Sequence, residues 1–65
     1  MSSMPTDLAE LSSIASSIDQ ITQRVAAIAE QANAAKEETT ASELFAIERA
    51  LLGARKRLER LVSGR

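Results

Sequence analysis

Residues 35–44 read AKEETTASEL, and this stretch decides the fold because it separates two apolar repeats that are out of phase. On each side of it, apolar residues recur every three or four positions, which is the spacing of the a/d seam of a coiled coil. The first repeat comprises Leu11, Ile14, Ile18, Ile21, Val25, Ile28, Ala32 and Ala35, and the second comprises Leu44, Ile47, Leu51, Ala54, Leu58 and Leu61.

The phase difference between the repeats predicts a turn. Continuing the first repeat would place seam positions at 39, 42 and 46, whereas the second repeat begins at Leu44. On one continuous helix, this slip would turn the apolar stripe by roughly 200°, at about 100° per residue. A chain that folds back on itself keeps both stripes facing one core. We therefore predict an all-α fold, an antiparallel two-helix coiled-coil hairpin formed by residues 1–65.

Capping signals place the ends of the two helices. After a short tail over residues 1–5, Thr6 is the expected N-cap of a first helix over about 6–36. The turn is expected over about 37–40. Thr40 and Glu43 have the spacing of a capping box, which predicts a second helix over about 41–62.

The two repeats also predict a register between the helices. Pairing Ala35 with Leu44 brings Ile18 level with Leu61, and the residue numbers of every such pair sum to the same value. This register places Asp19 beside Arg60, as a cross-helix ion pair of modest worth.

The predicted hairpin leaves apolar residues uncovered. The first helix is longer than the second, so Leu8, Leu11 and Ile14 should overhang. Phe45 and Leu52 flank the seam of the second helix. A chain of 65 residues without cysteine is small for a stable monomer. We expect a homodimer that forms a four-helix bundle. The expected dimer core comprises Leu11, Ile14, Ile18, Ile21, Val25, Ile28, Ile47, Leu51, Leu58 and Leu61.

The composition argues against catalysis and against bound cofactors. The chain has no histidine and no cysteine, the residues that most often serve as general bases and zinc ligands. The acidic residues near the turn, Glu37, Glu38 and Glu43, do not have the spacing of a calcium loop. We therefore predict no enzymatic activity, no metal and no cofactor.

Charge is divided unevenly along the chain, although the net charge is −1. Residues 1–48 hold eight acidic and two basic groups, whereas residues 49–65 hold six basic groups and one acidic group. The basic residues could contact phosphate, nucleic acid or an acidic protein. They could instead balance the dipole of their own helix and the acidic start of the first helix, which is the interpretation we favour. The candidate contacts are Arg55, Lys56, Arg57 and Arg60.

These features favour a self-associating protein-interaction or regulatory adaptor module over a nucleic-acid or nucleotide-phosphate binder. Leu8, Phe45 and Leu52 are the expected contacts with another protein, through helix docking or bundle completion. No apolar run approaches the length of a membrane span, and the N-terminus lacks the features of a signal peptide. We expect a cytoplasmic location and no membrane partner.

Overall fold

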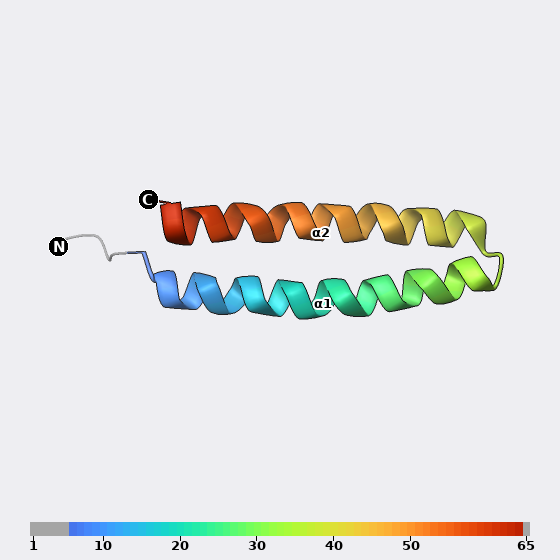
Figure 1. The fold of residues 1–65 in the computed structure, drawn as a ribbon, viewed down its shortest axis with the longest axis horizontal. Coiled ribbons are helices and arrows are strands. Elements are labelled where there is room, and N and C mark those ends of the chain that lie inside the picture. Colours follow the sequence, from blue (N-terminus) through green and yellow to red (C-terminus); the bar gives the residue numbers. More distant parts are fainter. Residues whose placement is uncertain (1–5, 65) are drawn as a thin grey trace.

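The computed structural model describes residues 6–64, which form a hairpin of two antiparallel helices (Figure 1). The helices are α1 (Leu8–Ala34) and α2 (Glu38–Gly64), each of 27 residues. They lie side by side in an elongated molecule with principal extents of 56 × 21 × 14 Å. The prediction of an all-α hairpin is confirmed. The expected tail over residues 1–5, and Arg65, lie outside the described residues.

Asp7, and not Thr6, caps the N-terminus of α1. The backbone of Asp7 is extended, and its Oδ1 accepts a hydrogen bond of 2.9 Å from the backbone N–H of Glu10. An aspartate here satisfies one of the free amides of the first turn and places negative charge at the positive end of the helix dipole. The predicted cap was therefore one residue too early.

The turn is shorter and lies earlier than predicted, over residues 35–37. The backbone N–H of Glu37 donates to the carbonyl of Ala32 at 2.9 Å, and that of Lys36 donates to the carbonyl of Asn33 at 3.1 Å. This pair of bonds is a Schellman motif, which requires a left-handed residue at its centre. Lys36 takes that conformation, with φ of 65°.

The capping box predicted at Thr40 does not start the second helix. α2 begins at Glu38, and the carbonyl of Glu37 already accepts a hydrogen bond of 2.9 Å from the N–H of Ala41. Thr40 is therefore inside the first turn of α2. The Schellman motif causes the shift, because it ends α1 at Ala34 and allows α2 to follow directly.

The earlier turn also changes the register between the helices. Arg55 pairs with Asp19 at 2.6 Å, so the prediction that Asp19 lies beside Arg60 is wrong. The partner lies five residues earlier along α2. Figure 1 shows the open ends of α1 and α2 at about the same level. The predicted overhang of α1 is consequently absent, and Leu11 is half-buried.

Small residues form the seam between the two helices. Ala15, Thr22 and Ala29 recur every seven residues on α1 and are 0% to 5% exposed. Ala32, also on α1, and Ala41, on α2, are buried as well. Side chains of this size let two helix axes approach closely. The hydroxyl of Thr22 donates to the carbonyl of Ile18 at 2.6 Å, so its polar group is satisfied within the seam.

The large apolar residues predicted to meet across the hairpin do so only in part. Six of them are half-buried along one edge of the small-residue seam: Leu11, Ile18, Val25, Leu44, Leu51 and Leu58. Five others are exposed: Ile14, Ile21, Ile28, Ile47 and Leu61. No large side chain among residues 6–64 is fully buried. The hairpin by itself therefore encloses only a thin core.

Candidate interaction surface

A row of large apolar side chains runs along each helix, one position before the residues that face the other helix. On α1, Ile14, Ile21 and Ile28 directly precede the buried residues Ala15, Thr22 and Ala29. On α2, Ile47 and Leu61 directly precede Glu48 and Val62, which are half-buried. The five apolar side chains of these rows are 39% to 57% exposed.

The two rows lie on the same side of the hairpin. One residue step turns an α-helix by about 100° in a fixed direction. Both helices are right-handed and they run antiparallel. On each helix, the residue that precedes an inward-facing position therefore lies on the same side of the hairpin. We call this side the apolar face. It comprises Ile14, Ile21, Ile28, Ile47, Ala54 and Leu61, with the half-buried Leu11, Ile18, Val25, Leu44, Leu51 and Leu58 between the rows.

The apolar face is large for so small a chain. None of its twelve side chains is charged or polar. Five of them are large side chains that are 39% to 57% exposed, so the face presents apolar surface on the order of several hundred Å², the scale of the ~800 Å² that each partner buries in a standard protein interface. The accessible surface of the chain is 4995 Å², so this face is a substantial share of it. Exposed apolar patches of this extent mark sites of association.

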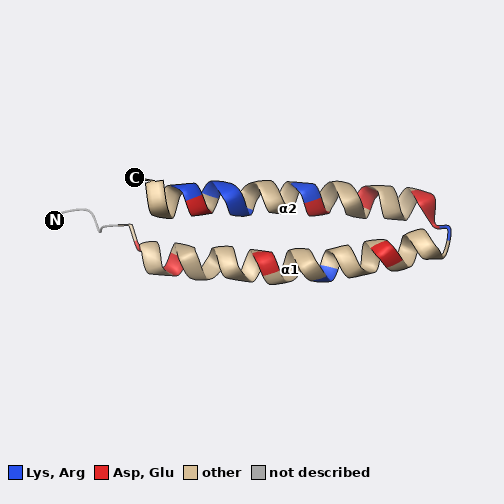
Figure 2. Ribbon diagram, in the orientation of Figure 1, with Lys and Arg blue, Asp and Glu red and all other residues tan. Residues whose placement is uncertain are grey.

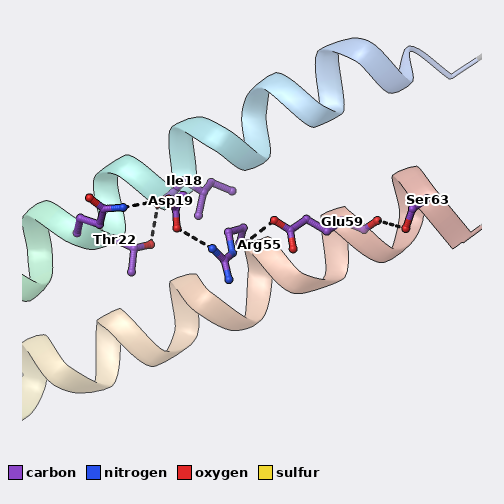
Figure 3. A network of polar contacts seen from close by, with 7 residues as sticks. Ile18, Asp19, Thr22, Arg55, Glu59 and Ser63 are labelled. Carbon is purple, nitrogen blue, oxygen red and sulfur yellow. Dashed lines mark hydrogen bonds and ion pairs between the residues drawn. The ribbon is translucent and has the colours of Figure 1, made fainter.

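The opposite side of the hairpin carries a polar network (Figure 3). The guanidinium of Arg55 donates through Nη1 to Oδ1 of Asp19 at 2.6 Å. The amide of Gln23 donates to the other oxygen of this carboxylate at 3.0 Å. Glu59 lies one turn after Arg55, with Oε2 at 3.7 Å from Nε. Ser12, Ser16 and Val62 line the shallow groove beside this network. We call this side the polar face.

Arg55 is committed to its two carboxylate neighbours. Its side chain is 24% exposed and bridges Asp19 of α1 and Glu59 of α2. It is therefore poorly placed to bind an external phosphate, although the sequence analysis predicted it as a candidate contact together with three other basic residues. Those three, Lys56, Arg57 and Arg60, are exposed. Figure 2 shows basic residues concentrated in the C-terminal half of α2 and acidic residues near the turn.

The residues expected to contact another protein do not form one patch. Phe45 and Leu52 are half-buried and lie seven residues apart on the polar side of α2. Phe45 lines a second shallow groove there, with Asn33, Ser42 and Arg49. Leu8 is the first residue of α1, at the far end of the hairpin, and is 36% exposed.

Within residues 6–64, histidine, cysteine and carboxylate groups form no cluster of three or more that could hold a metal ion. Neither α1 nor α2 contains an apolar stretch long enough to cross a membrane.

Comparisons with known proteins give no match to this chain, whether with protein families, with curated proteins or with solved structures.

Proposed function

We propose that this chain is a non-enzymatic, self-associating interaction module in which two hairpins join through their apolar faces into a four-helix bundle. The observation that carries the proposal is the charge-free apolar face, set beside a seam that buries only small side chains. In this arrangement the large residues predicted as the dimer core would be covered by the second hairpin.

The energetics of the single hairpin support a need for a partner. Its seam buries four alanines and one threonine. Burial of apolar area is the main term that offsets the conformational entropy of ordering a chain. In a hairpin of 65 residues without a disulfide, this term is small. Covering the apolar face would supply the missing burial.

The polar face would remain accessible after association, which leaves a surface for a second protein. Phe45 and Leu52 lie on this side, between the Arg55 network and the turn. An adaptor that docks another helix there would use apolar contacts at Phe45 and Leu52, with polar groups such as Arg49 at the rim of the groove.

Sedimentation equilibrium tests self-association. We expect the mass of a dimer for the wild-type chain at micromolar concentration. Ile21→Glu should give a monomer, because it would bury an unpaired charge in the interface twice per dimer. Gln20→Glu is the matched control, since it adds the same charge at the adjacent position, away from the apolar face.

Circular dichroism at several concentrations covers the case in which the variant also unfolds. For the wild type, the midpoint of thermal unfolding should rise with protein concentration, because association stabilises only the folded chain. The proposal would be refuted by a wild-type chain that is monomeric at every concentration over a 100-fold range and whose midpoint of thermal unfolding does not change with concentration.

The alternative function is a small nucleic-acid or nucleotide-phosphate binder that uses the basic half of α2. Lys56, Arg57 and Arg60 are exposed on this half of α2, which is the observation in its favour. Binding through phosphates would weaken steeply between low and physiological salt. Fluorescence anisotropy with a labelled oligonucleotide, at two salt concentrations, separates this alternative from apolar docking.

A further inference from the structure

We infer that the occupant of the apolar face is a second copy of this chain, seated so that α1 of one copy lies over α2 of the other and both turns are at the same end. This inference rests on the proposed function and specifies how the two copies meet. Two symmetric arrangements are open to stacked hairpins. A two-fold axis parallel to the helices places α1 over α2 of the partner, and a perpendicular axis places each helix over its own copy.

The two rows at the edges of the apolar face form three layers of unequal size. With Asp19 level with Arg55, Ile14 is level with Leu61, and Ile28 is level with Ile47. These two outer layers each present two large side chains. The middle layer pairs Ile21 with Ala54, so it presents one large and one small side chain.

This inequality favours the parallel axis. When α1 lies over α2 of the partner, the Ile21 of each copy meets Ala54 of the partner subunit. The large isoleucine side chain then fills the space left by the small alanine side chain. When each helix lies over its own copy, Ile21 meets its equivalent and the two alanines face one another across a gap. Cores that alternate large and small side chains pack to higher density, and gaps are destabilising.

Charge is compatible with the parallel axis. Asp7, Glu10 and Asp19 give the first half of α1 and its cap an acidic character, without a basic residue between 7 and 21. The last half of α2 has the opposite excess and lies at the same end of the hairpin. The parallel axis brings these oppositely charged halves of the two copies together. The perpendicular axis would place the basic half of each α2 over the acidic half of the other α2, which is an equally good match of charge. Side-chain size, and not charge, therefore decides between the two arrangements.

A distance between the two turns tests the arrangement. The chain has no cysteine, so Glu37→Cys in the exposed turn can carry a single nitroxide label. In the parallel arrangement, the two labels of a dimer should lie within about 25 Å, because both turns are at one end and a four-helix bundle is only two helices, each ~10 Å wide, across. In the perpendicular arrangement they should be about 40 Å apart, the length of a 27-residue helix at ~1.5 Å per residue.

Sedimentation of the same labelled sample separates the two possible failures. A dimer with the long distance would overturn the parallel arrangement and leave the proposed self-association standing. A folded monomer would overturn both. A dimer with the short distance is the expected result.

Enlarging the small residue of the middle layer gives a second test. Ala54→Leu should weaken self-association at least tenfold, because the added atoms would collide with Ile21 of the partner subunit. Ala46→Leu is the control, since it makes the same change at an exposed position of α2 outside the apolar face. Tighter association of Ala54→Leu would overturn the arrangement, because it would mean that the leucine fills a gap between facing alanines.

Discussion

Replacing Lys36 with glycine should stabilise the protein, although it removes a charge and a side chain from an exposed turn. Lys36 has φ of 65° and is the one non-glycine residue within 6–64 with a left-handed backbone. This conformation is required by the two hydrogen bonds that close α1 on Asn33 and Ala32. A side chain pays about 1–2 kcal/mol for this conformation, because its Cβ approaches the following carbonyl oxygen.

The net gain is smaller than this strain. Glycine has more conformational freedom in the unfolded chain, which costs roughly 0.5–1 kcal/mol relative to alanine. We therefore expect Lys36→Gly to raise the free energy of unfolding by about 0.5–1 kcal/mol per chain. For a domain of this size, each ~1 kcal/mol corresponds to roughly 4–8 °C in the midpoint of thermal unfolding.

Thermal unfolding followed by circular dichroism, at one fixed protein concentration, measures this effect. Lys36→Ala is the matched control, because it removes the same charge and keeps the strained backbone. Lys36→Gly should be more stable than both the wild type and Lys36→Ala. If the glycine variant were no more stable than the alanine variant, the left-handed turn would not be the conformation that closes α1.

Three other experiments test the seam, the cap and the polar face. Ala29→Leu should lower the free energy of unfolding by about 1–3 kcal/mol, because Ala29 is 0% exposed and the seam has no room for a larger side chain, whereas Ala27→Leu should be nearly neutral. Asp7→Ala should cost about 1 kcal/mol and shorten α1 at its N-terminus, seen as reduced amide protection in hydrogen exchange. A double-mutant cycle on Asp19→Ala and Arg55→Ala should give a coupling of about 0.5–1 kcal/mol, discounted for their partial exposure, and a coupling of zero would show that this pair does not hold the register.

The phase break between the two apolar repeats was enough to predict two antiparallel helices joined by a short turn, which we expected at about residues 37–40 and which the structure places at 35–37. The exact turn could not be predicted, because the usual signal of a Schellman motif is glycine or asparagine at the left-handed position. Lysine occupies that position here. The Thr40 capping box was a competing signal. It was wrong because α1 ends at Ala34 and α2 begins at Glu38, so Thr40 already lies inside the second helix.

The face that each helix turns toward the other was predicted only in part. Large apolar residues dominate the heptad pattern of the sequence, and Ile14, Ile21 and Ile28 form a clear heptad row. Ala15, Thr22 and Ala29 form an equally regular row one position later, but small and polar residues add little to an apolar pattern. Periodicity gives the direction of an apolar stripe on a helix, but it does not say whether that stripe faces a neighbouring helix of the same chain or lies open on the surface.

The pairing of Asp19 with Arg55 could have been recognised once the small residues were taken as the seam. Arg55 lies seven residues after Glu48 and seven before Val62, in the row of α2 that continues from the buried Ala41. Arg55 is a charged side chain in an inward-facing row and needs a partner, and Asp19 lies at the edge of the opposing seam. The charged residues therefore carried information about the register that the apolar residues alone did not.

The separation of small and large residues onto different faces has a physical consequence for how this chain folds. The small seam lets α1 and α2 approach closely, and the Asp19–Arg55 pair links them, but neither buries much apolar area. The area available for stabilisation lies on the apolar face, outside the hairpin. If a second copy covers that face, folding and association are one coupled reaction. A change on the apolar face should then alter the concentration at which the hairpin forms, and a change in the seam should alter the hairpin at every concentration.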